Sequence, residues 1–241
     1  TTEIYTLSLH DALPISTARH PRLLPVEPAR ALTMVRADKK FLASIILGCC
    51  LLAACGRLKQ WAYEGFNRDQ WQQPEKVIAA LQLRPGDQVA DLGAGGGYFT
   101  FKLGQAVGPA GRIYAVDIDR EMTDLIAQRA KRESVQNIET ILAQANDPML
   151  PKSGIDLIFT SNTYHHIENR VAYLAKLREY LKPGGKLAII DFDGRATIEG
   201  MLRHYTPAET IKREMEQAGY IRREEPNFLD RQSFLIFAVK G

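Results

Sequence analysis

The sequence predicts an α/β protein with a doubly wound, seven-stranded and mostly parallel sheet that includes a carboxy-terminal antiparallel strand. Three observations lead to this prediction. From residue 74 onward, short apolar segments alternate with segments of helical periodicity, a pattern typical of parallel strands joined by helices. The first apolar segment runs into the glycine-rich stretch "GAGGG". Two apolar segments near the end, "YIRREEP" and "SFLIFAVKG", supply the closing strands.

The first two strand–helix units are predicted between residues 74 and 117. A helix is expected over Pro74–Leu83, because proline suits the first helical turn and apolar residues follow at helical spacing. After the turn "RPGD" comes a short buried strand, Gln88–Gly93, which ends on glycine. A helix over Tyr98–Val107 and, after the turn "GPAG", a strand over Arg112–Asp117 complete this part.

The middle of the chain continues the alternation. Asp119 is expected to cap a helix that runs to about Arg132, with acidic residues close to its positive end. Two further strands are predicted over 138–143 and 155–162.

The last elements follow in the same manner. Thr206 is expected to cap a helix that has Pro207 in its first turn and stops at Gly219. The remaining predicted elements are a helix over 168–181 that ends at "KPGG" and strands over 186–193, 220–226 and 233–241.

Composition limits both the size and the chemistry of the protein. The 241 residues, 45% of them hydrophobic, suffice for one sizeable core plus an extension. From Gly56 onward there are 25 basic and 24 acidic residues, a balance that gives no support to nucleic-acid binding. The three cysteines, at positions 49, 50 and 55, all precede this part, so no disulfide, cysteine-ligated zinc or cysteine nucleophile is expected there.

The segment before the predicted domain resembles a bacterial lipoprotein signal. From Met34 a short basic stretch precedes an apolar run, Phe41–Ala54, that is too short for a bilayer span but right for a signal peptide. It ends in "LAAC", which resembles the lipobox, with Cys55 as the lipid attachment point. A buried helix or an apolar start that is never cleaved are the alternatives. We expect a membrane-anchored protein, in the outer membrane because Gly56 follows the cysteine, or a cytoplasmic one if the signal is not used.

These features divide the chain into four parts. Residues 5–15 resemble a translated sequencing adapter, so 1–33 are expected to be an artefact with untranslated upstream sequence, and disordered. Residues 34–55 form the predicted signal peptide. An amino-terminal arm over 56–73 and the domain over 74–241 follow.

The glycine-rich stretch after the first predicted strand indicates a ligand-binding loop. Glycines at 93, 95, 96 and 97 allow the backbone to approach a ligand that a Cβ atom would displace. A nicotinamide-binding loop offers a similar pattern, but its third glycine would fall on Tyr98 here. Asp91 precedes the loop, where it would repel a pyrophosphate but suit a cationic amino group.

At this point the chain resembles the class I S-adenosylmethionine-dependent methyltransferases. "DLGAGGG" matches the first motif of that family, and "VDID" (116–119) matches the acidic end of its second strand. "LKPGGKLAIIDF" (181–192) matches its motif leading into the fifth strand. The motifs occur in order at the family's spacing and cover about residues 70–241, so the resemblance implies a Rossmann-like fold and S-adenosylmethionine as cofactor.

The resemblance also implies a set of cofactor-binding residues. Asp91 would bind the amino group of the cofactor, directly or through water. Asp117 would accept from both ribose hydroxyls, and Ile118 would lie on the face of the adenine. Where the family often has Gly-Asp-Ala after the third strand, this chain reads "AQAND", so Gln144 or Asn146 would have to accept from the adenine amino group. The implied residues are Asp91, Gly93, Ala94, Gly95, Gly97, Tyr98, Asp117, Ile118, Gln144, Ala145, Asn146 and Asn162.

Methyl transfer needs alignment and, for a protonated acceptor, a base. "SNTYHHIENR" follows the fourth predicted strand, and Tyr164 and His165 are our catalytic candidates there. Alternatively, one of His165 and His166 packs under the loop while the other caps a helix. We predict no metal site, because adjacent histidines rarely point to one place. The arm segment "GFNRDQWQQP" (65–74), which contains Phe66 and Trp71, is either a cofactor cover or a simple packing arm.

The acceptor is not named by the sequence. The Asn/Asp-Pro-Pro-Tyr/Phe motif of methyltransferases that act on adenine or glutamine is absent, since the loop reads "SNTY". The cysteines that arsenite methyltransferases need are also absent from the predicted domain. We therefore expect a small-molecule acceptor. The alternative is a non-catalytic lipoprotein that retains the fold as a binding module, since export would separate the protein from a cofactor made in the cytosol.

Overall fold

The structure is a computed structural model that describes residues 68–195 and 205–240. All of these belong to one compact unit, Ile45–Gly241. The predicted signal peptide, the three cysteines, the segment before Met34 and most of the arm lie outside the described residues, so those predictions are not tested. Within the two described ranges, no helix is both long enough and apolar enough to cross a membrane.

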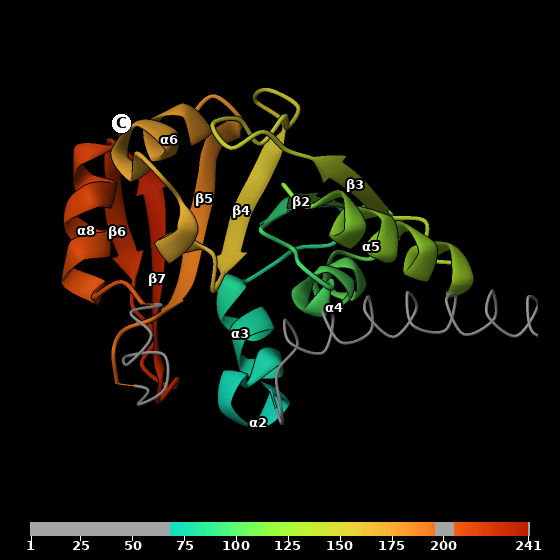
Figure 1. Cartoon of the computed structure of the whole chain (residues 1–241), viewed down its shortest axis with the longest axis horizontal. Coiled ribbons are helices and arrows are strands. Elements are labelled where there is room, and N and C mark those ends of the chain that lie inside the picture. Colours follow the sequence, from blue (N-terminus) through green and yellow to red (C-terminus); the bar gives the residue numbers. More distant parts are fainter. Residues whose placement is uncertain (1–67, 196–204, 241) are drawn as a thin grey trace, which may run out of the picture. The chain divides into compact units, whose positions relative to one another are not determined.

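Seven strands form a single sheet with helices on both faces, which confirms the predicted fold class (Figure 1). The strands are β1 (Gln88–Leu92), β2 (Arg112–Asp117), β3 (Ile138–Leu142), β4 (Ile155–Ser161), β5 (Leu181–Phe192), β6 (Tyr220–Glu224) and β7 (Gln232–Val239). The helices are α2 (Arg68–Gln72), α3 (Pro74–Leu81), α4 (Tyr98–Val107), α5 (Arg120–Arg132), the 3₁₀ turn η1 (Tyr164–His166), α6 (Arg170–Leu177) and α8 (Ala208–Gln217).

The sheet order is β3-β2-β1-β4-β5-β7-β6. The first five strands in this order are parallel, and β7 runs antiparallel to both β5 and β6. The chain therefore starts in the middle of the sheet, builds outward to β3, and returns to build the other half from β4. The order reverses between β1 and β4, the position at which open α/β sheets bind ligands at their carboxyl ends.

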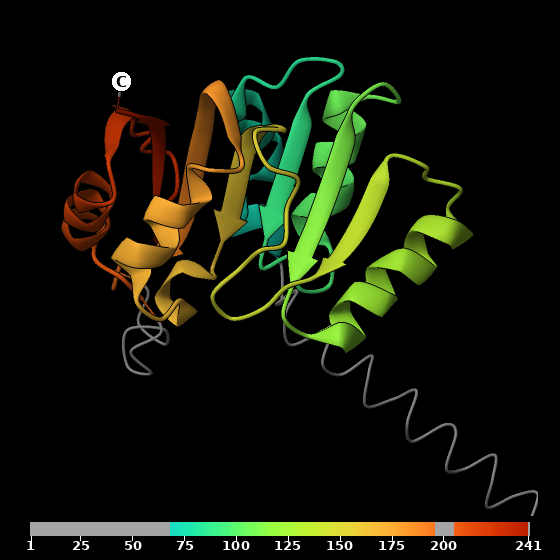
Figure 2. The ribbon, with the colours of Figure 1, turned by 90° about the horizontal axis from the view of Figure 1, so that it is seen from above.

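Two hydrophobic clusters cover the two faces of the sheet. On one face, Phe99 and Leu103 of α4 pack against Val89, Ile113 and Phe159 on the strands. On the other face, Leu174 of α6 and Met215 of α8 pack with apolar side chains that include Ile158 and Ile189. Buried on both faces, the central strands are almost continuously apolar, as parallel strands require. Figure 2 shows the helices on either side.

Two local predictions are wrong. The helix predicted over 168–181 is shorter in the structure, where α6 begins at Arg170 and ends at Leu177. It ends there because tight turns follow at residues 178–180 and Leu181 already pairs with Ile155. Strand β5 therefore includes "KPGG", which is accommodated by a shift of register. Thr206 does not cap α8: its amide donates to Phe192 of β5, and Pro207 stands at the cap position.

Candidate functional site

The polar residues of interest lie where the parallel strands end. The carboxyl ends of β2, β1, β4 and β5 meet at one edge of the sheet (Figure 2). The loops that follow these four strands carry most of the residues singled out in the sequence. We call the part formed after β1 and β2 the loop side, and the part formed after β4 and β5, with the start of β7, the strand-end side.

The glycine loop leaves β1 by turning toward β2. The amides of Gly93 and Ala94 both donate to the carbonyl oxygen of Val116, over 2.8 and 3.1 Å. Gly93 has a φ of +74°, and a Cβ atom there would lie 2.2 Å from Oγ1 of Thr163. Only glycine fits this position, since both the backbone conformation and the contact with the loop after β4 exclude a side chain. We call the loop backbone from Gly93 to Gly95 the cradle; at Gly93 it packs directly against the loop after β4.

Asp117, at the end of β2, is tied to this cradle. Its Oδ2 atom accepts a hydrogen bond from the Gly95 amide at 2.8 Å, and its Oδ1 atom accepts from the Asp119 amide at 2.9 Å. The carboxylate is thus fixed by backbone donors before any ligand arrives. Asp119 caps α5 as predicted, its side chain accepting from the Glu121 amide. Next to it, Ile118 is 69% exposed, which is unusual for a large apolar side chain.

Asp91 places a second carboxylate close to the loop. It is 3% exposed, and its Oδ2 atom accepts a hydrogen bond from the Thr100 hydroxyl at 2.7 Å. Burial raises the pKa of Asp91 from 3.8 to about 6, against the hydrogen bond from Thr100 and the positive charge of Arg68. A buried carboxylate that is ionised is a suitable partner for a cationic group, because the cation offsets the cost of burying the charge.

The loop after β3 carries the residues predicted to contact adenine. Gln144, Ala145 and Asn146 are exposed, and Gln144 forms a backbone bridge with Asp147. Asp147, which the sequence did not single out, anchors the loop through Lys176 Nζ at 2.5 Å and the Tyr180 hydroxyl at 2.8 Å. The hydrogen bond from Lys176 lowers the pKa of Asp147 to about 2.

The segment after β4 crosses in front of the cradle. Asn162 has a φ of +58°, its backbone amide donates to the Ile190 carbonyl, and its side-chain oxygen accepts a hydrogen bond from the side-chain amide of Gln232 on β7. Asn162 is thus fixed next to Thr163, which contacts Gly93. The predicted contact between Asn162 and the cofactor stays a prediction.

The two catalytic candidates point to different places. Tyr164 is fully buried, and its hydroxyl donates to Oε2 of Glu214 on α8 at 2.7 Å, where Arg170 also binds. Burial and this hydrogen bond raise the pKa of Tyr164 far above its ordinary value. The phenol therefore joins η1 to α8, and the structure places its hydroxyl in the packing between them.

His165 instead faces β5. Its Nδ1 atom lies 2.7 Å from Oδ1 of Asp191, a carboxylate whose side chain has no solvent exposure, while the His165 side chain keeps 8%. Burial raises the pKa of Asp191 above its ordinary value, and the hydrogen bond with His165 opposes that rise. Asp191 was missed in the sequence because it lies inside an apolar strand, where nothing indicates a contact with His165. His166 is exposed, and its ring centroid lies 4.1 Å from that of His165.

Unsatisfied polar atoms gather on the same strand-end side. In the described part of the chain, three buried side-chain oxygens lack a well-formed hydrogen bond, and they belong to Thr160, Asp191 and Gln232. Thr206 lies close enough to lower the pKa of Asp191 without completing such a bond for its Oδ2 atom. Buried polar atoms without partners are rare in native proteins, so a polar ligand or ordered water is expected here.

Helix α2 closes the site from the amino-terminal side. Gln72 is buried and donates to the Ser161 hydroxyl at 2.7 Å, and the Trp71 ring lies 5.7 Å from that of Phe192. Arg68 lies over the ring of Tyr98, 3.9 Å from its centroid. The helix therefore packs on the ends of β4 and β5, and the cofactor cover and the simple packing arm both stay predictions. Phe66 lies outside the described residues.

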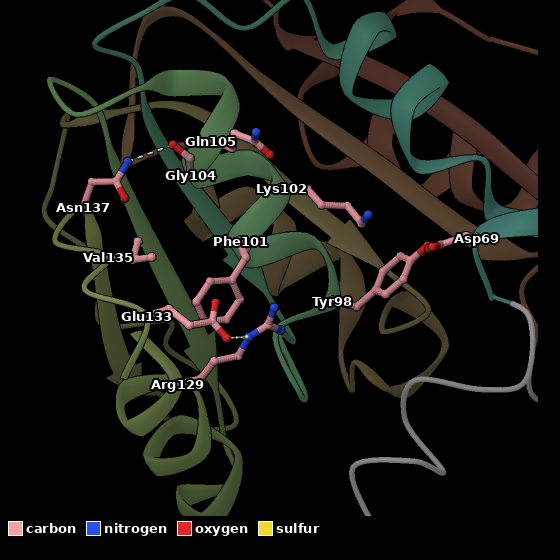
Figure 3. Close-up of a pocket in the computed structure, with 10 residues that line it drawn as sticks. All are labelled: Asp69, Tyr98, Phe101, Lys102, Gly104, Gln105, Arg129, Glu133, Val135 and Asn137. Carbon is pink, nitrogen blue, oxygen red and sulfur yellow. Dashed lines mark hydrogen bonds and ion pairs between the residues drawn. The ribbon is translucent and has the colours of Figure 1, made fainter. Parts of the chain in front are cut away.

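A cavity of about 630 Å³ lies along the flank of α4 rather than at the strand ends (Figure 3). Tyr98 and Asp69 face each other at one end of it, and Arg129 pairs with Glu133 at the other. The cavity therefore touches the candidate site at Tyr98 and at Asp69 of α2. Among the described residues, no group of His, Cys, Asp and Glu side chains could hold a metal ion.

The loop side suits a ligand with an amino group and vicinal hydroxyls. Two carboxylates, Asp91 and Asp117, flank the cradle, whose Gly93 has no room for a side chain because Thr163 packs against it. The exposed Ile118 offers an apolar surface for a planar ring next to Asp117. These features fit the methionine, ribose and adenine parts of S-adenosylmethionine.

Comparisons with known proteins agree with this geometry. Residues 83–227, more than half of the chain, match the family described as "Methyltransferase domain". A ubiquinone/menaquinone biosynthesis C-methyltransferase from Francisella philomiragia is 31% identical over 119 residues, which cover 49% of this chain and 48% of that protein. Its counterpart from Shewanella pealeana is 24% identical over 197 residues, or 68% and 77% of the two chains.

The fold is shared with solved structures. A crystal structure of a SAM dependent methyltransferase from Aquifex aeolicus superposes with a TM-score of 0.69 and 24% sequence identity. The match covers 74% of this chain and 95% of that one. The chain thus spans about half the length of the Francisella relative but nearly all of the Aquifex structure.

Proposed function

The chain belongs to the class I S-adenosylmethionine-dependent methyltransferases, and we propose that it transfers the cofactor's methyl group to a small-molecule acceptor. The observation that carries this proposal is the pair of carboxylates, Asp91 and Asp117, at a glycine cradle that excludes a side chain. A nicotinamide dinucleotide is disfavoured, because its pyrophosphate would meet the Asp91 carboxylate.

Cofactor binding divides among residues of the loop side. Asp91 binds the amino group of the methionine moiety, the cradle from Gly93 to Gly95 lines that moiety, and Asp117 accepts from the ribose hydroxyls. Each such charge-assisted hydrogen bond contributes about 1.5–3 kcal/mol. Ile118 covers the adenine. When bound, S-adenosylmethionine would supply an electrophilic methyl group: the acceptor bonds to the methyl carbon, and the carbon–sulfur bond breaks with its electron pair on sulfur, which leaves as a neutral thioether.

The strand-end side receives the acceptor and its proton. The acceptor binds near His165, which takes the proton that the acceptor loses as its new bond to carbon forms. Asp191 holds the imidazole through Nδ1 and stabilises the resulting positive charge. Both curated relatives described above are C-methyltransferases of ubiquinone or menaquinone biosynthesis, so hydroxylated aromatic rings are the first acceptors to try.

Calorimetric titration of the full chain with S-adenosylmethionine tests the cofactor assignment. We expect binding by the wild type and a loss of about 10- to 100-fold in affinity for Asp117→Ala. NADH, titrated in the same way, should give no heat. An Asp117→Ala variant that binds as tightly as the wild type would sink the assignment.

Transfer of a labelled methyl group to a panel of phenols, hydroquinones, thiols and amines tests the catalytic part. His165→Gln should lower transfer by about 10²- to 10⁴-fold while cofactor affinity stays the same. Tyr164→Phe is the matched control, because its hydroxyl faces Glu214. If the wild type binds the cofactor but methylates neither the panel nor a host extract, the non-catalytic binding module becomes the better description.

The location of the protein is a separate part of the proposal. Cys55 carries the lipid anchor and Gly56 directs the protein to the outer membrane, on the basis of the basic stretch, the apolar run and "LAAC". Labelled fatty acid should enter the wild type expressed from Met34 and not the Cys55→Ser variant. Soluble, unlabelled wild-type protein would instead support a cytoplasmic enzyme.

A further inference from the structure

Arg68 is a cation placed at the amino-terminal end of α4, beside the glycine loop. Its guanidinium group lies 3.9 Å from the centroid of the Tyr98 ring and 5.8 Å from that of Phe99, the first two residues of α4. Its positive charge also acts on the Asp91 carboxylate, where it lowers the pKa. Arg68 therefore shares one site with the residue that binds the amino group.

The orientation of Arg68 is fixed by its neighbours. Its Nε atom donates to the Gln72 side chain, and Gln72, which is fully buried, donates in turn to the Ser161 hydroxyl of β4 at 2.7 Å. The Tyr98 ring supports the plane of the guanidinium, and the Tyr98 hydroxyl donates to Asp69 at 2.5 Å. An arginine held in this way loses little further entropy when it binds a planar anion.

Charge gives a reason for a cation at this place. The methionine end of the cofactor is a zwitterion, with a carboxylate on the same carbon as its ammonium group. Asp91 attracts the ammonium but repels the carboxylate, and Asp117 adds a second negative charge nearby, as its effect on Asp91 shows. Without a cation next to Asp91, repulsion of the cofactor's carboxylate would partly cancel the binding energy that Asp91 gains from the ammonium group.

We propose that Arg68 binds the carboxylate of the cofactor's methionine moiety, so that Arg68 and Asp91 recognise the two ends of the zwitterion together. The assignment rests on the proposed function, because it places a further residue in the same cofactor site. Arg68, on α2, would then make the protein bind S-adenosylmethionine more tightly than adenosyl sulfonium compounds that have no carboxylate.

The test compares S-adenosylmethionine with its decarboxylated form, which keeps the amino group and the sulfonium. Calorimetry on the full chain should show that the wild type prefers S-adenosylmethionine by about 10- to 100-fold. In Arg68→Met this preference should disappear, because binding of S-adenosylmethionine weakens while binding of the decarboxylated form does not. Arg68→Lys should retain part of the preference, since it keeps the charge without the planar fork.

Arg129 provides a matched control. Its guanidinium lies 3.8 Å from the centroid of the Phe101 ring, so it is stacked on α4 as Arg68 is, but it pairs with Glu133 on the far part of the α4 cavity (Figure 3). Arg129→Met should leave both affinities within about twofold of the wild type.

The outcomes separate this inference from the proposed function. A wild type that binds neither compound refutes the proposed function, and the inference with it. A wild type that binds both equally, or an Arg68→Met variant that keeps the full preference, overturns the inference alone. Binding of the decarboxylated compound by Arg68→Met also shows that the variant is folded, so a loss of preference cannot be attributed to unfolding.

Discussion

The loop side and the strand-end side of the site are held together in different ways. On the loop side, hydrogen bonds join backbone amides to carboxylates of two consecutive strand–loop units, as between Gly95 and Asp117. On the strand-end side, side chains from segments far apart in the chain meet, 70 residues apart for Asn162 and Gln232. The proposed cofactor side can therefore be built from two consecutive motifs, whereas the proposed acceptor side depends on the packing of several distant segments.

Gly93→Ala should lower the free energy of unfolding more than any other substitution considered, because Gly93 lies where the loop side contacts the strand-end side. The new Cβ would lie 2.2 Å from Thr163 Oγ1 at a φ of +74°. Left-handed strain and overpacking together should lower the free energy of unfolding by roughly 3–5 kcal/mol. Denaturant unfolding measures this loss, and cofactor binding should disappear with it.

Gly184→Ala separates strain from contact. Gly184 has a φ of +81°, but a Cβ there would meet nothing within 4 Å. Backbone strain alone should therefore lower the free energy of unfolding, by about 1–2 kcal/mol. Equal losses for the two variants would mean that the contact between Gly93 and Thr163 has no energetic weight and that the two sides are independent.

Asp91→Asn should stabilise the protein while it weakens cofactor binding. The pKa of Asp91 is raised from 3.8 to about 6 by burial, so the folded state resists ionisation. The wild type therefore loses stability as the pH rises from about 4 through 6, and an amide does not. At pH 7.5 the variant should be more stable by up to about 3 kcal/mol.

The difference in stability should become small near pH 4 and vanish near pH 3, below the ordinary pKa of 3.8, where Asp91 is protonated in both the folded and the unfolded states. Thermal melts of both proteins from pH 3 to 8 measure this convergence. Cofactor affinity of the wild type should fall below pH 6 for the same reason. A variant less stable than the wild type at pH 7.5 would show that Asp91 is structural rather than reserved for a cationic ligand.

Gln72→Leu tests how the strand-end side depends on α2. It removes the buried bond to Ser161 and leaves that hydroxyl without its donor, which should cost about 1–2 kcal/mol of unfolding free energy. The double variant Gln72→Leu/Ser161→Ala should recover part of this loss, because neither polar partner remains. Strict additivity of the two single losses in denaturant titrations would mean that α2 is not coupled to β4.

The same contrast explains what could be predicted from the sequence. The sheet, the motifs of the loop side and the cap of α5 follow from short stretches of the sequence. Gly93, Asp117 and Ile118 could therefore be named as candidate cofactor-binding residues from "DLGAGGG" and "VDID" alone. The helix predicted over 168–181 was wrong at its end, because pairing of Leu181 with Ile155 overrides the local preference for helix.

Residues of the strand-end side could not be found in this manner. Asp191 lies inside an apolar strand, and nothing near it in the sequence indicates that His165, 26 residues earlier, would contact it. Gln72 and Ser161 are 89 residues apart, and their bond depends on how α2 crosses the sheet. The role of such residues is set by tertiary packing, so each looks ordinary in the sequence.

Ile118→Ser should have the smallest effect on stability and still change binding. The side chain is 69% exposed, so its loss should alter the unfolding free energy by less than about 0.5 kcal/mol. If the adenine of the cofactor covers this side chain, binding buries it, and the variant should bind S-adenosylmethionine several-fold more weakly. Calorimetry and denaturant unfolding on the same preparation separate the two effects. Lower stability with unchanged affinity would mean that Ile118 packs within the fold and that the adenine lies elsewhere on the loop side.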